Sequence, residues 1–242
     1  MQKHHPLLWL FWPIIIISIT PSQCASAEEA CVEDPLESIL KEMQKVSETT
    51  KDIKAQMRLL IYDAEFEETT ERSGLFYLIK KGELLRIVFE KPHPKEWYVD
   101  EKYFIEYFPD TKLATRWKRK KEEERFQEAR RFSYFGIGAT VEELRKSFEI
   151  TLVETKESSE KTEDKKKFIL QLMPKTDEVE TPYHKIHISV REGQWIPFEV
   201  KGFKGSGNTE TWIFSKIKIN SGLKEKEVRF SPAKDVVIED EE

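Results

Sequence analysis

The sequence predicts an α+β fold in which about eleven antiparallel strands form one domain with interspersed helices. Three observations lead to this prediction. Apolar residues alternate with a period of two over most of the chain, and turn signals separate these runs at regular spacing. Only a few segments show the helical period. The 242 residues contain neither an internal repeat nor a linker long enough to separate domains.

The composition favours a folded chain with its own hydrophobic core. Hydrophobic residues make up 38% of the sequence and aromatic residues 12%, which is enough to fill a sizeable interior. Charged residues are numerous but nearly balanced, with a formal net charge of −5, so a nucleic-acid partner is not expected. The 2 cysteines cannot form a disulfide-dense secreted scaffold.

The N-terminus has the three parts of a secretory signal. A short cationic start precedes the apolar run Leu7 to Ile19, and Ala25-Ser26-Ala27 supplies the small residues of a cleavage site. We therefore expect a signal peptide at residues 1–27, cleavage after Ala27, and a mature domain of residues 28–242. The alternatives are a membrane anchor, for which the apolar run is short, and lipidation at Cys24, for which the preceding residues are a poor match.

The first expected element is a helix over Pro35 to Val46. Its apolar residues recur at the spacing of one helical face, and Asp34 followed by Pro35 supplies a cap and a favoured first helical residue. After this helix the period changes to two, which predicts a series of strands. The expected strands are 57–61, 75–79, 85–89, 97–99 and Tyr103–Phe108, with tight reversals at 81–83 and 100–102.

The centre of the chain departs from the strand pattern. Lys118 to Arg131 is a highly charged run with few β-branched residues, which favours a solvated helix; a basic patch for an acidic partner is the alternative. Thr140 and Glu143 have the spacing of a capping box, which predicts that a second helix runs through Leu144 to Phe148.

Strands resume in the second half of the chain. The polar stretch Lys156 to Lys167 is expected to form a long exposed hairpin loop, and Lys204 to Asn208 a short one. The acidic tail from Asp235 is expected to be frayed. The expected strands here are 148–153, 168–173, 186–190, 195–203 and Thr209–Ile219.

The sequence shows no constellation typical of a catalytic or metal site. Gly136-Ile137-Gly138 lacks the third glycine of a dinucleotide fingerprint, and Gly205-Ser206-Gly207 does not fit a nucleophile elbow. His184 and His187 would point to opposite faces of one strand, which prevents joint metal ligation. We therefore expect a binding protein and not an enzyme, with no metal and no cofactor.

Several short motifs follow one another in a specific order. They are Phe76 to Arg86, Trp97 to Lys102, Tyr107-x-Pro109, Phe135 to Gly138, Leu170-x-Leu172-x-Pro174-Lys175, Gly207-Asn208-Thr209-x-Thr211, Ile217-x-Ile219-Asn220 and Phe230-x-Pro232. Together they resemble the family of LolA, the periplasmic lipoprotein carrier, over nearly the whole mature chain. The resemblance implies an incomplete antiparallel β-barrel, with helices forming a lid over an apolar cavity that holds lipoprotein acyl chains in the periplasm.

An acyl-chain cavity needs an apolar lining, which we expect on one face of the first strands. Ordinary core packing is the alternative, because a period of two does not distinguish a cavity lining from a filled core. The expected cavity residues are Leu75, Tyr77, Ile79, Leu85, Ile87, Phe89, Trp97 and Val99. The expected lid residues are Lys81, Phe132, Phe135, Ile137 and Leu144.

Lys81 has a place among the lid residues because of the family pattern. Lys81-Gly82 stands where the family has Arg followed by Pro, and the resemblance implies that this Arg ties the lid by hydrogen bonds. A lysine offers a flexible point charge instead of a planar fork of donors, so we expect a weaker tether here. The basic segment Arg116 to Lys121 and the loop Lys156 to Lys167 are elaborations of the family pattern.

The resemblance implies a role in lipoprotein transport. The protein would bind lipoprotein acyl chains as a monomer and move lipoproteins from an inner-membrane release complex to an outer-membrane acceptor. Two alternatives use the same fold: a carrier of another lipid, and a sensor of mislocalised lipoproteins. An enzyme or a polysaccharide-binding module is the alternative from a different class.

Overall fold

The first half of the described chain starts with a helix, and strands follow it. The computed structural model describes residues 34–118, 137, 139–156, 165–176, 179 and 181–241. The first elements are α1 (Pro35–Thr49), β1 (Asp52–Asp63), β2 (Glu68–Ile79), β3 (Leu84–Lys91), β4 (Lys95–Val99), β5 (Tyr103–Phe108) and β6 (Leu113–Lys118). The later elements are α3 (Val141–Ser147), β7 (Phe148–Lys156), β8 (Lys167–Pro174), β9 (Lys185–Arg191), β10 (Pro197–Phe203), β11 (Thr209–Ile219), α4 (Glu225–Val228) and β12 (Val237–Glu241).

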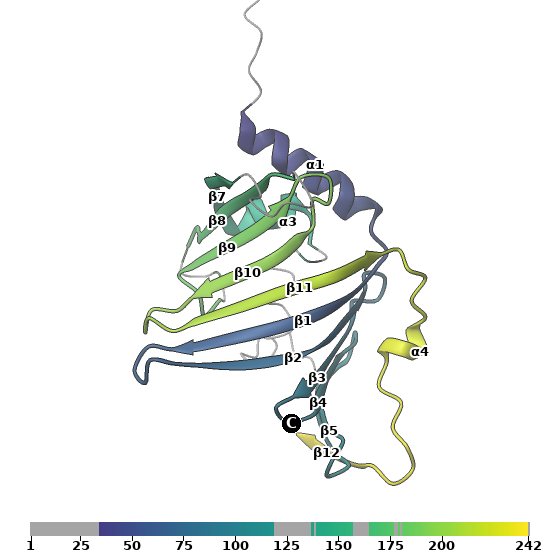
Figure 1. The fold of residues 1–242 in the computed structure, drawn as a ribbon. Coiled ribbons are helices and arrows are strands. Elements are labelled where there is room, and N and C mark those ends of the chain that lie inside the picture. Colours follow the sequence, from purple (N-terminus) through teal and green to yellow (C-terminus); the bar gives the residue numbers. More distant parts are fainter. Residues whose placement is uncertain are drawn as a thin grey trace, which may run out of the picture. The chain divides into compact units, whose positions relative to one another are not determined.

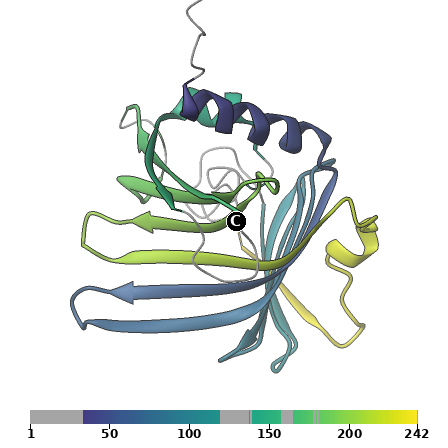
Figure 2. The same ribbon diagram turned by 45° about the horizontal axis from the view of Figure 1, so that its top comes forward.

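The strands of the described ranges form one sheet. Its 12 strands follow the order β12-β6-β5-β4-β3-β2-β1-β11-β10-β9-β8-β7 (Figure 1). Because β7 and β12 lie at opposite edges, the sheet stays open and does not close into a barrel. The sheet curves, and α1 and α3 lie across one side of it (Figure 2). These findings confirm the α+β class and the open sheet, with one strand more than the expected eleven.

The cap of α1 is the one that the sequence predicts. Asp34 Oδ1 accepts a hydrogen bond from the backbone N–H of Leu36 at 3.1 Å, and Pro35 occupies the first turn. The helix ends at Thr49, three residues later than expected, because the N–H of Thr50 still bonds to a carbonyl of the last turn. One face of α1 is buried against the sheet.

The capping box of α3 is also confirmed. The hydroxyl of Thr140 accepts from the N–H of Glu143 at 3.2 Å, and the Glu143 carboxylate accepts from the N–H of Thr140 at 2.7 Å. The helix begins directly after this cap and buries Val141 and Leu144.

Antiparallel pairing determines which residues share a face of the sheet. For example, Phe76 of β2 lies opposite Ala55 of the neighbouring strand β1 and opposite Ile87 of β3 on its other side. Partners across an antiparallel pair point to the same side, so these three residues face the same core. The buried apolar residues of α1, α3 and both halves of the sheet belong to one cluster. We call the face of the sheet toward this cluster the inner face.

The C-terminal segment corrects the prediction of a frayed tail. Val237–Glu241 forms β12, which pairs in parallel with β6, and neither strand was predicted. Arg116 of β6 donates two hydrogen bonds to the Asp240 carboxylate, at 2.5 and 2.8 Å. Trp117 Nε1 donates to Glu241 at 2.7 Å. All β12 side chains are exposed, so the sequence of this strand shows no alternation of apolar and polar residues that would predict it. Hydrogen bonds between oppositely charged side chains of β6 and β12 support the observed register.

Some expectations fall outside the described residues. The signal peptide and its cleavage site, the charged run Lys118 to Arg131 beyond its first residue, and most of the loop Lys156 to Lys167 are among them. Within the described part of the chain, no helix is long and apolar enough to cross a membrane.

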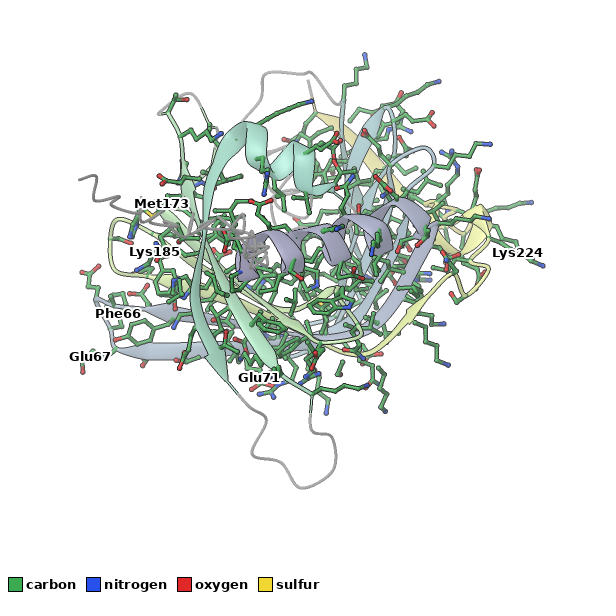
Figure 3. The ribbon with its side chains drawn as sticks, turned by 90° about the horizontal axis from the view of Figure 1, so that it is seen from above. Phe66, Glu67, Glu71, Met173, Lys185 and Lys224 are labelled. Atoms are coloured by element: carbon green, nitrogen blue, oxygen red, sulfur yellow. The ribbon has the colours of Figure 1, made fainter. Side chains whose placement is uncertain are left out.

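The β1–β2 hairpin carries an exposed aromatic side chain. Phe66 is 69% exposed, and it projects with Glu67 from the hairpin tip, away from the helices (Figure 3). The side chains around Phe66 at this tip are mostly acidic, so the tip does not present an extended apolar surface.

Candidate ligand-binding site

The inner face is filled at its centre by aromatic side chains from the three strands β2, β3 and β11. Phe76 and Phe214 meet with ring centres 5.3 Å apart, and Phe89 and Trp212 with ring centres 6.5 Å apart. Phe76 and Phe89 are 0% and 1% exposed. This packing makes the middle of the inner face part of the folded core, whatever else the face binds.

Curvature of the sheet brings these rings together. Trp212 is on β11 and Phe89 on β3, three strand spacings away, which would separate them by about 14 Å in a flat sheet. Their ring centres lie 6.5 Å apart because the sheet bends toward the core. Gly74 of β2 lies opposite Phe89, at a register shift between β2 and β3. A Cβ on Gly74 would lie 1.7 Å from the carbonyl oxygen of Val88, so the two backbones approach closely only because this residue is glycine.

A row of rings continues from the core across β3 to β6. We call Phe89, Trp97, Phe104 and Trp117 the aromatic row. The distances between successive ring centres are 4.9, 6.1 and 5.4 Å, and the last pair is stacked. Trp97 and Trp117 are half-buried, whereas Phe89 and Phe104 are buried, so two of the four rings have partly accessible surface. It offers flat, polarisable apolar surface of the kind that contacts acyl chains.

The register separates the residues that we expected to share one cavity face. Leu85, Ile87, Phe89, Trp97 and Val99 all lie on the inner face. Leu75, Tyr77 and Ile79 lie on the outer face, because Phe76 between them points inward. The expectation of one shared face is therefore wrong for these three residues. The five consecutive apolar residues 75–79 could not define a face by their period.

The C-terminal segment explains why β2 is apolar on both faces. Val228 of α4 is 1% exposed and packs with Ile79 and Leu84 in a second, smaller cluster. Further along, Phe230 lies 5.1 Å from Tyr98 and 5.6 Å from Tyr107, measured between ring centres. The outer face of β2 to β5 is thus covered by this chain itself.

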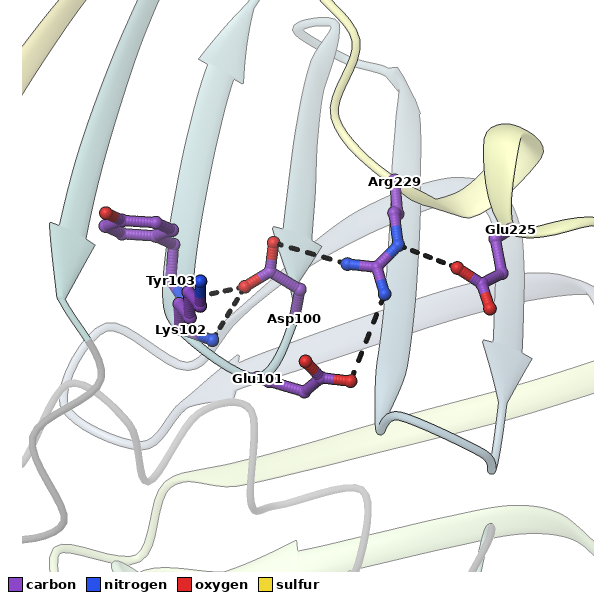
Figure 4. Close-up of polar contacts among 6 residues, drawn as sticks. All are labelled: Asp100, Glu101, Lys102, Tyr103, Glu225 and Arg229. Carbon is purple, nitrogen blue, oxygen red and sulfur yellow. Dashed lines mark hydrogen bonds and ion pairs between the residues drawn. The ribbon is translucent and has the colours of Figure 1, made fainter.

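Arg229 holds the same segment on the turn between β4 and β5. Its guanidinium lies 3.0 Å from Glu225, 3.9 Å from Asp100 and 4.0 Å from Glu101, and Asp100 also accepts the backbone N–H groups that close this turn (Figure 4). These side chains are 26–59% exposed, so packing of Val228 and Phe230 contributes more to holding the segment than the ion pairs do.

A small cavity lies between the helices and the sheet. Its volume is about 20 Å³, which is room for roughly one water molecule. Its lining residues come from α1, α3, the sheet and the turn before β10: Met43, Ser47, Thr50, Ile53, Lys80, Ala139, Val141, Leu144, Trp195 and Ile196. We call α1 and α3 together the helical layer, and the cavity beneath them the seam. The seam is too small for an acyl chain in this structure.

Lys80 connects the helical layer to the sheet. Its Nζ donates to the carbonyl oxygen of Ser47, in the last turn of α1, at 2.8 Å. A cation at a helix C-terminus also interacts favourably with the helix dipole. Lys81, which the resemblance placed at the tether, is exposed, so its neighbour makes the contact. Sequence reasoning missed Lys80 because adjacent lysines point to opposite sides of a strand end, and only the register reveals which one faces the helix.

The helical layer holds together through its own polar contacts. Arg145 of α3 donates to both carboxylate oxygens of Glu37 in α1, at 2.5 and 2.7 Å. Gln44 Oε1 of α1 accepts the N–H of Val141 at 2.8 Å, which satisfies a free donor at the start of α3. These contacts tie α1 and α3 to each other.

The structure places two of the expected lid residues inside the core. Ile137 is 4% exposed and Leu144 is 3% exposed, and both belong to the main cluster. Phe132 and Phe135 lie outside the described residues. Among the described residues, no three side chains of His, Cys, Asp or Glu lie close enough together to hold a metal ion.

Comparisons with known proteins concern the fold. No protein-family model matches the chain, and no curated protein matches it. Among solved structures, an uncharacterised conserved protein from Thermus thermophilus is similar, with 13% identity, a TM-score of 0.54, and coverage of 86% of this chain and 100% of that one. The Thermus protein therefore shares the fold.

Two further similar structures come from proteins with a named role or superfamily. A putative outer membrane lipoprotein-sorting protein domain from Vibrio parahaemolyticus is 13% identical, with a TM-score of 0.44 and coverage of 79% of this chain and 94% of that one. A LolA superfamily protein from Nitrosomonas europaea is 12% identical, with a TM-score of 0.40 and coverage of 80% and 97%. The structural neighbours thus include LolA superfamily and lipoprotein-sorting proteins.

Proposed function

We propose that this protein is a carrier that binds the acyl chains of a lipoprotein or of another lipid on its inner face, beneath the helical layer. The observation that carries this proposal is the inner face itself. It is apolar, it belongs to an open sheet, and the aromatic row extends it beyond the filled core to half-buried positions. The order of sequence motifs supports the same function independently.

Loading requires that the helical layer moves. An acyl chain gains about 0.8 kcal/mol for each CH₂ group that leaves water, so a chain of ordinary length can offset the cost of displacing packed side chains. The seam of about 20 Å³ is where a chain would begin to separate the layer from the sheet. The Lys80–Ser47 hydrogen bond is one of the contacts that such a movement would break.

Copurified lipid tests the carrier proposal. We expect native mass spectrometry of the protein, purified from its own cells without detergent, to show adducts with the mass of acyl-bearing molecules. Organic extraction should remove the adducts and yield the corresponding lipids. A preparation that carries no lipid and binds none when lipid vesicles are added would exclude the carrier function.

The finer proposal is transfer of lipoproteins from an inner-membrane release complex to an outer-membrane acceptor. The motif resemblance supports it, and depletion of the protein in its host tests it. Lipoproteins should then accumulate in the inner-membrane fraction. Normal lipoprotein distribution together with altered lipid composition would instead identify a carrier of another lipid, and an altered stress response alone would identify a sensor.

A further inference from the structure

Two cations interrupt the apolar inner face beside the aromatic row. Arg72 of β2 points inward, because its partner on β1 is the core residue Leu59. Its Cζ lies 5.9 Å from the centre of the Phe89 ring. Lys95 of β4 lies opposite Phe89, and its Nζ is 5.7 Å from the same ring centre. The strands on both sides of β3 therefore place one cation each next to the first ring of the aromatic row.

Of these two cations, Lys95 pairs with a carboxylate and Arg72 does not. Lys95 Nζ pairs with Glu106 Oε1 at 2.6 Å, and Trp97 Nε1 donates to the same oxygen at 2.8 Å. In the part of the chain that the structure describes, no carboxylate oxygen lies within 4.0 Å of the Arg72 guanidinium. The cluster thus has an excess of positive charge on a surface that is otherwise apolar.

The guanidinium of Arg72 could pair with a bound anion. Arg72 is half-buried as a residue, and no carboxylate of the described residues pairs with its guanidinium. A guanidinium presents a planar fork of N–H donors that matches two oxygens of a carboxylate or a phosphate. Contact with the Phe89 ring does not replace such a pairing, because a cation–π contact is weaker than a charge-assisted hydrogen bond.

We infer that Arg72, together with Lys95, binds the anionic headgroup of an amphiphile whose acyl chain lies along the aromatic row. This inference rests on the carrier function proposed above. It narrows the ligand class to lipids with a carboxylate or phosphate headgroup. The geometry suits such a ligand, because the cations stand at Phe89, where the half-buried part of the aromatic row meets the filled core.

A pair of probes with the same chain and different headgroups tests the inference. The delipidated protein is titrated with cis-parinaric acid and with its methyl ester, whose fluorescence rises in an apolar site. We expect the acid to bind about tenfold more tightly than the ester, the gain typical of one charge-assisted hydrogen-bonding contact. Arg72→Gln should remove this preference by weakening the binding of the acid to the level of the ester.

Matched variants separate the headgroup contact from effects on folding. Arg58→Gln is the control, because Arg58 lies on the neighbouring strand, points to the outer face and pairs with Glu71 at 2.8 Å. It should keep the preference for the acid. Arg72→Lys keeps the charge without the planar fork and should retain part of the preference. Thermal unfolding of each variant shows whether it is folded at the temperature of the titration.

The outcomes of the titrations point to different conclusions. If neither probe binds, the carrier function fails, and this inference fails with it. If the wild-type protein binds both probes equally, the carrier function stands and the anionic subsite is wrong. A preference that survives Arg72→Gln would exclude Arg72 from headgroup binding. Displacement of the acid by millimolar inorganic phosphate would show a site for the free anion and would overturn the lipid assignment.

Discussion

At the scale of single residues, a few polar side chains join segments that are far apart in the sequence. The Asp52 carboxylate at the start of β1 accepts hydrogen bonds from the N–H and hydroxyl of Ser221, at 2.8 and 2.7 Å, and from the N–H of Gly222 at 3.1 Å. Asn220 next to them accepts the N–H of Lys51 at 2.6 Å and donates to the carbonyl of Thr49 at 3.0 Å. One polar cluster thus joins the end of α1, the start of β1 and the end of β11.

Asp52 makes a specific contribution to stability that depends on pH. Burial alone would raise the pKa of its carboxyl group, but the hydrogen bonds from Ser221 and Gly222 favour the charged form and lower the pKa below the ordinary value. A carboxylate with a lowered folded-state pKa stabilises the protein above the unfolded-state pKa of about 3.9, and this contribution is lost as the pH falls through the folded-state pKa.

We therefore expect Asp52→Asn to lower the free energy of unfolding at pH 7 by about 1–3 kcal/mol and to flatten its decline at acidic pH. Denaturant unfolding at pH 7 and at pH 3 measures both effects. Asp110→Asn, in the exposed turn between β5 and β6, is the control and should change neither value. Equal acid sensitivity of Asp52→Asn and the wild-type protein would contradict the role of this carboxylate.

At the scale of elements, the sequence predicted the capped helices and the strands with clear alternation better than the pairing of segments. The caps at Asp34 and Thr140 are local hydrogen bonds, so sequence spacing is enough to predict them. β12 was missed because its pairing with β6 involves charges 124 residues apart in the sequence, such as Arg116 and Asp240. Local patterns carry no information about such partners.

Gly74 controls the packing of β2 against β3. A methyl group at this position would meet the Val88 carbonyl oxygen at 1.7 Å, which forces the two backbones apart and weakens the contact of Phe89 with the core. We expect Gly74→Ala to destabilise the protein by about 2 kcal/mol or more. The measurement is the midpoint of thermal unfolding combined with denaturant titration.

Gly205→Ala is the matched control for this substitution. A Cβ added at Gly205, in the hairpin between β10 and β11, would meet no atom within 4 Å, and its effect should stay within about 0.5 kcal/mol. If both substitutions proved equally mild, the close approach of β2 and β3 at Gly74 would not be a requirement of the fold.

At the scale of the whole molecule, the candidate site depends on how the apolar residues are divided between two faces. The sequence pattern predicted Leu85, Ile87 and Phe89 on one face, and the register places all three in the core. The pattern could not assign Leu75, Tyr77 and Ile79, because residues 75–79 are all apolar and show no alternation. The side chain that covers Tyr77 and Ile79 on the outer face, Val228, belongs to the distant C-terminal segment. Most apolar residues on both faces are buried by the chain itself. The half-buried part of the aromatic row therefore remains as the candidate surface for a ligand.

Movement of the helical layer is the property of the whole molecule that the carrier function requires. The Ser47 hydroxyl faces the seam under α1, is buried, and has no hydrogen-bond partner among the described residues. A cysteine at this position reports opening of the seam, because a buried thiol reacts with a maleimide only when the layer separates from the sheet. We therefore expect Ser47→Cys, with Cys24 and Cys31 replaced by serine, to react slowly in the lipid-free protein and several-fold faster during lipid uptake.

Two further variants make this experiment specific. Ser215→Cys, exposed on β11, should react fast with or without lipid, which controls for an effect of lipid on the reagent. Adding Lys80→Met to Ser47→Cys removes the hydrogen bond from Lys80 to the Ser47 carbonyl, so the thiol should react faster even without lipid. If lipid changes neither rate while it binds, the ligand enters without separating α1 from the sheet, and the helical layer is a fixed part of the core.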